Sequence, residues 1–277
     1  MRKPVISAAV AALSLALALT ACGAQDKGSG GGGDDGALVV GATAVPAGEV
    51  LAYIKKDLAA KNGLDLEIKE FTDYVLPNTA LQEGSLDANL YQNEPFLDDF
   101  NKSKGTDLVP VVDAYLPPMG VYSKKVQDVG ELPDGATVAV PNDTTNEGRA
   151  LKLLASEGVI TLKEGAGPTA SPADIAKNPK NLRFKELEPA QLPRSLDDVA
   201  AAVINNNYAQ DAGLSPADDA VLLESVKDNP YANLLAVKKG DEDDPRVEKL
   251  ARLLTSAEVR KFIEDKYKGS VLPVTAG

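Results

Sequence analysis

The sequence of 277 residues contains no histidine and a single cysteine, Cys22. Without an imidazole, the chain cannot form a histidine-based triad, an imidazole general base or a His-ligated zinc site. A single cysteine excludes an internal disulfide and a cysteine cluster for a metal. The remaining carboxylates, lysines, tyrosines and serines form no arrangement that indicates catalysis. We therefore expect a protein that is not an enzyme and that has neither a metal nor a cofactor.

Basic residues are also few, because 29 Lys and Arg stand against 41 Asp and Glu, which gives a formal net charge of −12. Phosphate binding needs basic side chains clustered on one face, and none is evident, so we exclude a nucleic-acid partner. With 44% hydrophobic residues, the chain is long enough to form one large domain or two lobes of ordinary size.

The amino terminus has the pattern of a bacterial lipoprotein signal. Residues 1–3 form a short basic segment, residues 5–19 form an apolar run, and small residues precede Cys22. The apolar run is shorter than the ~20 residues of a spanning helix, which favours a removed signal over a permanent anchor. We expect residues 1–22 to be a signal peptide that ends at a lipidated Cys22; the alternative is a free buried cysteine after a short membrane helix. Two acyl chains, such as palmitate, would suffice for stable anchoring on the extracytoplasmic face of the cell membrane.

Residues 23–36 are rich in Gly and Asp and contain almost nothing that can be buried, which predicts a flexible tether with a reach of about 20 Å. Two sets of alternating strands and helices follow. The first has strands at 37–42, 64–68 and 88–91 with helices at 48–61 and 76–82; the second has strands at 137–140, 182–187 and 200–205 with helices at 145–156 and 195–199. Asp244 and Thr255 are expected to cap the last two helices.

Alternation of this kind is typical of mostly parallel sheets flanked by helices. The Pro117–Pro118 pair cannot lie inside a sheet and marks a crossing between lobes, and the segment from Pro230 crosses back. We therefore predict an α/β fold of the two-lobed, type II periplasmic-binding-protein kind with a ligand cleft between the lobes. Lobe 1 comprises residues 37–116 and 231–277, and lobe 2 comprises residues 117–230.

Polar residues follow a strand in each predicted lobe. Tyr91 ends the strand at 88–91 and is followed by Gln92, Asn93 and Glu94. The strand at 200–205 ends at Asn205, the first of three consecutive asparagines. Ligands of open α/β sheets bind beyond the carboxyl ends of the strands, so both groups are expected to face the cleft. The alternatives are an ordinary helix–strand unit with a polar loop and a chance similarity of two short segments.

Several motifs together resemble the NlpA family of methionine-binding lipoproteins. They are FTDYVLPNTAL at 71–81, LDANLYQNEPFL at 86–97, YSKK at 122–125, VAVPNDTTNEGRAL at 138–151, NPKNL at 178–182, PRSLDD at 193–198, AVINNNYA at 202–209 and YAN at 231–233. The resemblance implies the solute-receiving subunit of an amino-acid ABC importer. Such a protein closes over its ligand and delivers it to a membrane permease driven by an ATPase, and we expect it to be a monomer.

By matching motif, the ligand-binding residues implied by the resemblance are Tyr74, Tyr91, Asn93, Arg149, Asn205 and Asn233. The chemistry of these residue types suits an amino acid. A guanidinium fork near a helix amino terminus favours a carboxylate, amides suit the charged groups, and tyrosines suit a thioether. The alternatives are a solvated or structurally paired arginine, turn asparagines, and tyrosines that serve only as core.

One departure from the family concerns the ligand. Methionine receptors of this family usually have Phe-Gln-His-Lys-Pro where this chain has Tyr91-Gln92-Asn93-Glu94-Pro95. The exchange of His for Asn93 removes a ring and alters a contact to the ligand. Methionine is the leading ligand, and another amino acid, a Met-containing dipeptide or another small anion is the alternative. From other classes of protein, the alternatives are an extracytoplasmic enzyme on the same fold and a surface adhesin without a ligand.

Overall fold

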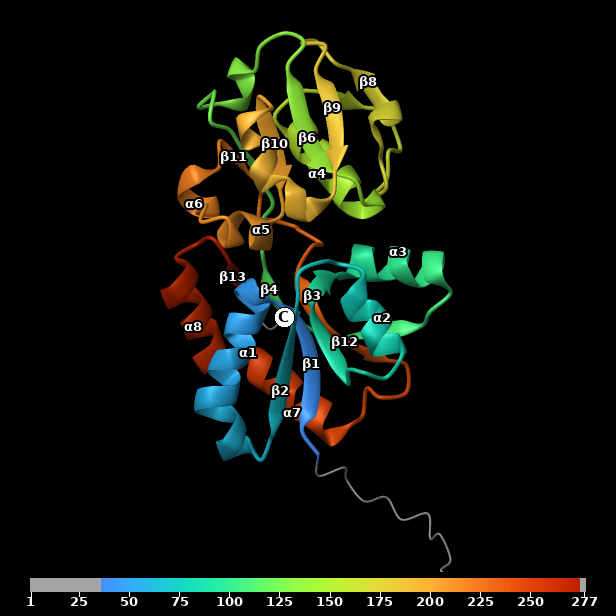
Figure 1. The fold of residues 1–277 in the computed structure, drawn as a ribbon, viewed down its shortest axis with the longest axis vertical. Helices are drawn as coiled ribbons and strands as arrows, with labels where there is room; N and C mark the ends of the chain where they lie inside the picture. Colours follow the sequence, from blue (N-terminus) through green and yellow to red (C-terminus); the bar gives the residue numbers. More distant parts are fainter. Residues whose placement is uncertain (1–35, 275–277) are drawn as a thin grey trace, which may run out of the picture. The chain divides into compact units, whose positions relative to one another are not determined.

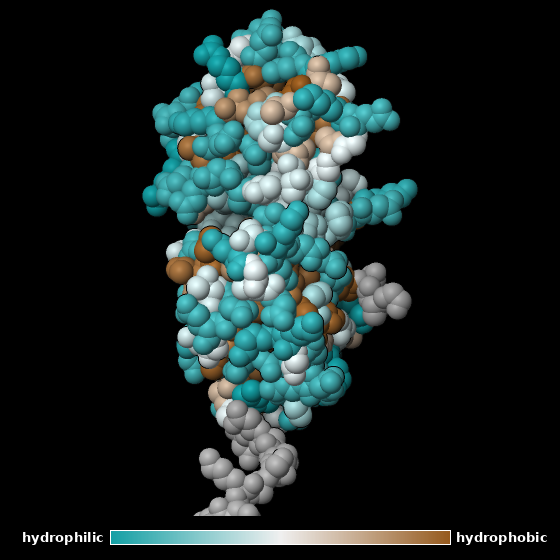
Figure 2. All heavy atoms as spheres, turned by 90° about the vertical axis from the view of Figure 1, so that its right-hand side faces the viewer, coloured by the Kyte–Doolittle hydropathy of each residue, from teal (hydrophilic) through white to brown (hydrophobic). Residues whose placement is uncertain are grey.

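The computed structural model describes residues 36–274, which belong to one compact unit. The predicted signal at 1–22, the predicted lipid on Cys22 and the tether up to residue 35 lie outside this range. Among the residues described, no helix is both long and apolar enough to cross a bilayer. The face drawn in Figure 2 is mostly hydrophilic, with small apolar areas.

Lobe 1, the lower one in Figure 1, is built on a six-stranded sheet of order β13-β4-β12-β3-β1-β2. Its strands are β1 (Leu38–Thr43), β2 (Leu66–Phe71), β3 (Ala88–Asn93), β4 (Leu108–Leu116), β12 (Asn233–Lys238) and β13 (Leu272–Pro273). β1 pairs in parallel with β2 and β3, whereas β12 is antiparallel to β3 and β4, and β13 is antiparallel to β4. The predicted alternation of strands and helices thus forms the parallel half of the sheet.

Lobe 2 carries a five-stranded sheet of order β11-β5-β10-β6-β9. Its strands are β5 (Gly120–Tyr122), β6 (Thr137–Pro141), β9 (Arg183–Leu187), β10 (Ala201–Ile204) and β11 (Leu222–Leu223). β6 lies parallel to β9 and β10, and β5 is antiparallel to β10 and β11. A separate small hairpin pairs β7 (Thr161–Leu162) with β8 (Ile175–Lys177).

Helices cover both faces of each sheet because successive side chains of a strand point to opposite sides. The helices are α1 (Glu49–Tyr53), α2 (Leu76–Gln82), α3 (Glu94–Lys104), α4 (Thr144–Ser156), α5 (Asn206–Asp211), α6 (Pro216–Asp219), α7 (Pro245–Leu254) and α8 (Ala257–Tyr267).

In lobe 1, α1, α7 and α8 pack on one face of the sheet and α2 and α3 on the other (Figure 1). In lobe 2, Val138 and Val140 of β6 face α4, whereas Ala139 between them faces α5. Each large apolar side chain buried in this way contributes about 1.5–3 kcal/mol.

The chain passes between the two sheets twice. Residues 117–119 join β4 to β5, and residues 224–232 join β11 to β12. The proline pair at 117–118 lies in the first crossing, as the sequence predicted. The boundaries given above for the two lobes stay a prediction.

Two local predictions were incomplete. The strand predicted at 88–91 continues to Asn93, and α3, which was not predicted, begins at the next residue. The side chain of Asn93 caps this helix by accepting a hydrogen bond from the backbone N–H of Phe96 at 3.1 Å. The cap of the last helix is Ser256, whose Oγ accepts from Val259, and not Thr255, so that prediction was wrong by one residue.

Candidate functional site

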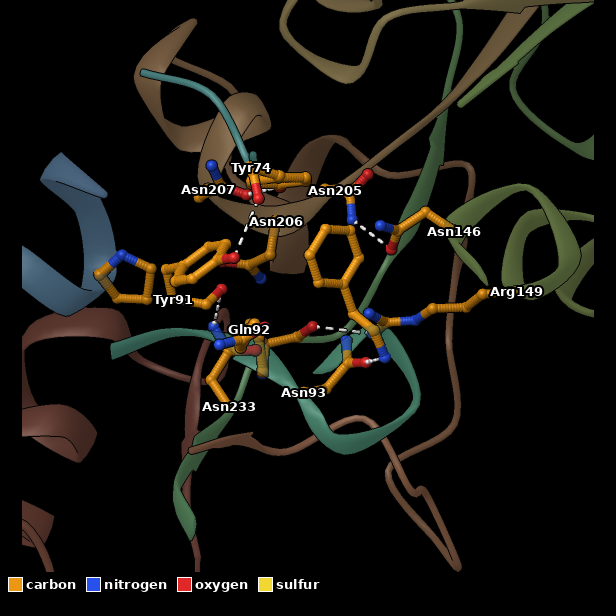
Figure 3. A pocket seen from close by; sticks show the side chains of 13 residues that line it. Tyr74, Tyr91, Gln92, Asn93, Asn146, Arg149, Asn205, Asn206, Asn207 and Asn233 are labelled. Atoms are coloured by element: carbon orange, nitrogen blue, oxygen red, sulfur yellow. Dashed lines mark hydrogen bonds between the residues drawn. The ribbon is translucent and has the colours of Figure 1, made fainter. Parts of the chain in front are cut away.

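A cavity of about 390 Å³ lies between the two sheets. Figure 3 shows its lining, which comprises Pro46, Tyr74, Tyr91, Gln92, Asn93, Phe96 and Asn233 from lobe 1, Pro117 from the first crossing, and Asn146, Arg149, Asn205, Asn206 and Asn207 from lobe 2. The carboxyl ends of β1 and β3 and the strand end of β10 all reach this cavity, as expected for open α/β sheets.

All six residues predicted from the sequence lie in the wall of this one cavity: Tyr74, Tyr91, Asn93, Arg149, Asn205 and Asn233. The structure therefore brings together side chains up to 159 positions apart (233 − 74). Their role as ligand contacts stays a prediction.

Of the seven other lining residues, Gln92, Asn206 and Asn207 were expected to face the cleft, and that prediction is confirmed. Glu94, expected beside them, does not line the cavity. The lining residues that were not predicted are Pro46, Phe96, Pro117 and Asn146. The strand-end rule pointed to the positions of Gln92, Asn206 and Asn207, whereas nothing in the sequence distinguished Phe96 from an ordinary core residue.

Three aromatic rings form an apolar wall in lobe 1. The ring centroid of Tyr74 lies 6.0 Å from that of Tyr91 and 5.9 Å from that of Phe96, and the Tyr91–Phe96 separation is 6.1 Å. The hydroxyl of Tyr91 donates to the backbone carbonyl of Tyr74 at 2.9 Å, which fixes the two rings relative to each other. Burial raises the pKa of both tyrosines well above the ordinary value, so both stay neutral. The wall offers an apolar surface with the polar tips already hydrogen-bonded.

A buried network of three amides supports this wall from below. Asn78 of α2 exchanges two hydrogen bonds with Gln92 of β3, at 2.7 and 2.8 Å, and accepts a third from Asn89 at 2.8 Å. The three side chains are at most 3% exposed. Because α2 starts two residues after Tyr74, this network holds Tyr74 against β3.

Arg149 is the one charged residue among the described residues that line the cavity. It lies in the second turn of α4, a helix capped by Asp143, whose Oδ1 accepts from the backbone N–H of Asn146 at 3.0 Å. The sequence reading left open a structural ion pair, and the structure contains one. Arg149 is 3% exposed and binds the carboxylate of Glu224 at 2.6 Å. One edge of the guanidinium fork, predicted to face a ligand carboxylate, is therefore already occupied.

Several amide groups of the wall have unused hydrogen-bonding capacity. Asn205 donates to Asn146 at 2.8 Å, and Asn207 accepts from the hydroxyl of Tyr74 at 2.5 Å. Asn205 Oδ1 and Asn207 Nδ2 are buried and have no partner among residues 36–274. Buried polar atoms are almost always hydrogen-bonded in folded proteins, so one unpaired acceptor and one unpaired donor beside a cavity indicate the positions of ligand groups.

The chemistry of this wall is that of recognition. It combines a cation, amide donors and acceptors, and an apolar surface, and its described residues include no Ser, Cys, Lys or carboxylate that could act as a nucleophile or base. Within residues 36–274, no three metal-ligating side chains converge. The arrangement suits a small molecule with an anionic end, a hydrogen-bond donor and an apolar part.

Comparison with known proteins identifies the family. A sequence model of the family described as NlpA lipoprotein matches residues 38–275. The D-methionine-binding lipoprotein MetQ of Salmonella typhimurium is 43% identical to this chain over 267 residues, which cover 96% of each protein.

Two solved structures have the same fold. A nutrient binding protein from Burkholderia cenocepacia bound to methionine is 49% identical, with a TM-score of 0.82 over 85% of this chain and 99% of that one. A periplasmic substrate-binding protein of an ABC transporter from Coxiella burnetii is 41% identical, with a TM-score of 0.82 over 86% of this chain and 100% of that one. The resemblance read from the motifs is confirmed, and the chain belongs to the NlpA lipoprotein family.

Proposed function

We propose that this protein is the solute-binding subunit of an ABC importer, that methionine is its ligand, and that it is not an enzyme. The observation that carries the proposal is a single cavity with walls from both lobes that contains a cation, unpaired amide groups and three aromatic rings. The names of the relatives support the choice of ligand, since one is a D-methionine-binding lipoprotein and another was solved bound to methionine.

Each part of methionine has a complement in this wall. Arg149 receives the carboxylate through the part of its guanidinium that faces the cavity, and Asn205 Oδ1 accepts a hydrogen bond from the ammonium. Tyr74 and Tyr91, with Phe96, surround the thioether, because sulfur packs favourably against aromatic rings. Asn93 and Asn233 complete the polar side of the cavity.

Binding is coupled to closure of the lobes. Contacts from both lobes are needed, since a ligand favours the closed state only by its differential affinity for it. We propose that residues 117–230 move as one body relative to residues 37–116 and 231–277, with the two crossing segments as the hinge. Tyr208 of lobe 2 donates to the carbonyl of Thr72 in lobe 1 at 3.0 Å, and the bond from Tyr74 to Asn207 also spans the lobes.

The protein acts next to the membrane. We propose that residues 1–22 are removed as a signal, that Cys22 carries lipid, and that residues 23–36 tether a monomeric body to the extracytoplasmic face. From there it delivers its ligand to a permease and an ATPase. The family's description as a lipoprotein supports the anchor, and the Coxiella relative, a part of an ABC transporter, supports the partners.

A different ligand in the same role is the second candidate, and Asn93 favours it. The Oδ1 of Asn93 is committed to capping α3, so the side chain offers only its amide N–H groups to the cavity. A ligand with a hydrogen-bond acceptor near this position, such as another amino acid or a Met-containing dipeptide, would be bound by these N–H groups.

A calorimetric titration of the full-length chain with L-methionine, D-methionine, the other amino acids and Met dipeptides tests the proposal. Saturable binding of methionine with unaltered methionine recovered at the end is the expected result. Arg149→Ala should weaken binding by about 2–5 kcal/mol, since it removes a buried cation. Arg252→Ala is the matched control, because Arg252 is exposed, pairs with Glu248 and does not line the cavity. Equal affinity in the wild type and Arg149→Ala would remove Arg149 from the site.

A further inference from the structure

The guanidinium of Arg149 is held on two sides by groups other than a ligand. Its Nε donates to Glu224 Oε1 at 2.9 Å, and its Nη2 donates to Glu224 Oε2 at 2.6 Å and to the carbonyl of Pro117 at 3.1 Å. The ring of Tyr231 lies against its face, 4.3 Å from Cζ. The Nη1 atom has no hydrogen-bond partner within residues 36–274. Because Arg149 lines the cavity, Nη1 is the group that it offers to a ligand.

Glu224 is itself buried and ionised. Its side chain is 11% exposed, and its Oε2 also accepts from the backbone N–H of Met119 at 3.2 Å. Burial opposes ionisation, but the charge of Arg149 and the hydrogen bonds from Arg149 and Met119 outweigh it, so the pKa of Glu224 lies below its ordinary value. A buried carboxylate with this many donors stays charged across the physiological pH range.

The ion pair leaves the cavity with almost no net charge. Arg149 contributes the only formal charge in the described wall, and Glu224 balances it at hydrogen-bond distance. Asp143, another carboxylate nearby, caps α4 and accepts hydrogen bonds from Asn146 at 2.9 and 3.0 Å, but burial outweighs these bonds and raises its pKa, which disfavours its charged form. A desolvated site without net charge favours a ligand that also has none, such as a zwitterion.

We propose that Glu224 is a positioning and specificity residue: it turns Nη1 of Arg149 towards the cavity and makes the site select a zwitterionic amino acid over the anion that lacks the ammonium group. This inference rests on the proposed function, since it takes a free amino acid as the ligand. Glu224 acts through Arg149 and does not itself line the cavity.

The test compares two probes by calorimetry on the full-length chain: methionine and 4-(methylthio)butanoate, which is methionine without its amino group. In the wild type, the anion should bind at least about tenfold more weakly than methionine, because the acceptor that meets the ammonium stays unpaired. In Glu224→Gln, the anion should gain roughly tenfold, since a negative charge close to its carboxylate is gone. Methionine should change less, because the gain at its carboxylate and the loss at its ammonium offset each other.

Glu224→Asp separates charge from shape. It keeps the negative charge but shortens the side chain, so both probes should weaken while the ratio of their dissociation constants stays close to that of the wild type. A ratio that moves in Glu224→Asp as it does in Glu224→Gln would show that charge is not the cause and would overturn the proposal.

The wild type alone also tests the idea if Glu224→Gln does not fold. A third probe, 3-(methylthio)propylamine, is the cation without the carboxylate, and a neutral site binds this cation and the anion both more weakly than methionine. An anion that binds wild type as tightly as methionine does overturns the inference. If Glu224→Gln binds methionine and the ratio of the dissociation constants of the anion and methionine is the same as in the wild type, the inference is wrong but the proposed function stands. If the wild type does not bind methionine, the proposed function is wrong as well.

Discussion

Tyr208→Phe should weaken ligand binding although Tyr208 does not line the cavity. Its hydroxyl, on α5 of lobe 2, donates to the carbonyl of Thr72 in lobe 1 at 3.0 Å, and its ring centroid lies 5.0 Å from that of Tyr74. Phenylalanine keeps the ring contact and removes only the hydrogen bond. In an open form the hydroxyl would be hydrated instead, so the bond stabilises the closed form alone.

The magnitude follows from the net worth of one hydrogen bond, about 1 kcal/mol with a range of about 0.5–1.5 kcal/mol. Closure should become about fivefold less favourable, and the dissociation constant for methionine should rise by up to the same factor. Titration calorimetry measures the constant, and stopped-flow fluorescence should place most of the change in the dissociation rate.

Tyr53→Phe is the matched control, because Tyr53 lies in lobe 1 and does not line the cavity. Its ring stacks on Phe262 of the same lobe, with centroids 4.3 Å apart. This variant should bind methionine as the wild type does. A Tyr208→Phe protein that melts at a lower temperature but binds with unchanged affinity would refute the reasoning, since the hydrogen bond would then serve the fold and not closure.

Three further predictions concern the stability of the body, measured as the free energy of unfolding in urea. Asn78→Ala should lower it by roughly 2–4 kcal/mol, because the amides that Asn78 pairs are left buried without partners. Gly148→Ala should lower it by about 1–3 kcal/mol, since the added Cβ would lie 2.1 Å from the backbone oxygen of Pro168. Burial and the nearby Glu186 raise the pKa of Glu147 from 4.5 to about 7. The contribution of Glu147 to the free energy of unfolding is therefore present below pH 4.5 and is lost as the pH rises through 7. Glu147→Gln should remove this part of the pH dependence.

Each of these has a result that would contradict it. An Asn78→Ala protein as stable as the wild type would mean that water replaces the lost amide. Gly167→Ala is the control for Gly148→Ala, because nothing lies near its Cβ position and its φ is not positive, and equal stability of these two variants would contradict the clash with Pro168. For Glu147, wild type and Glu147→Gln with parallel stability curves between pH 5 and pH 8 would exclude the group as the source of the pH dependence.

Local patterns in the sequence were sufficient to predict much of the fold and several residues of the cavity wall. Helix α2 begins and ends where the apolar spacing and Gly84 indicate, and the strand-end rule placed Tyr91 and Asn205 at the cavity. Helix α3 was not predicted although its signals are local, with Asn93 as the cap and Gly105 at its end.

The pairings that set the chemistry of the cavity could not be predicted in the same way. Arg149 and Glu224 are 75 residues apart, and Asn146 and Asn205 are 59 residues apart. Neither separation leaves a periodic or spacing signal, since both contacts form only when distant elements pack together. The arginine was found from its motif, but the carboxylate that occupies one edge of its guanidinium belongs to a segment that resembles an ordinary surface turn.

Strand β1 runs from the end of lobe 1 where the chain enters towards the cavity. The strand begins at Leu38 and ends at Thr43, three positions before Pro46 of the cavity wall, so the entry of the chain and the cavity lie at opposite ends of one strand about 17 Å long (Figure 1). A body held from its amino-terminal side therefore keeps the length of β1 between its support and the cavity wall. The same arrangement makes this end suitable for immobilisation on a sensor surface, because the point of attachment is separated from the cavity wall by that strand.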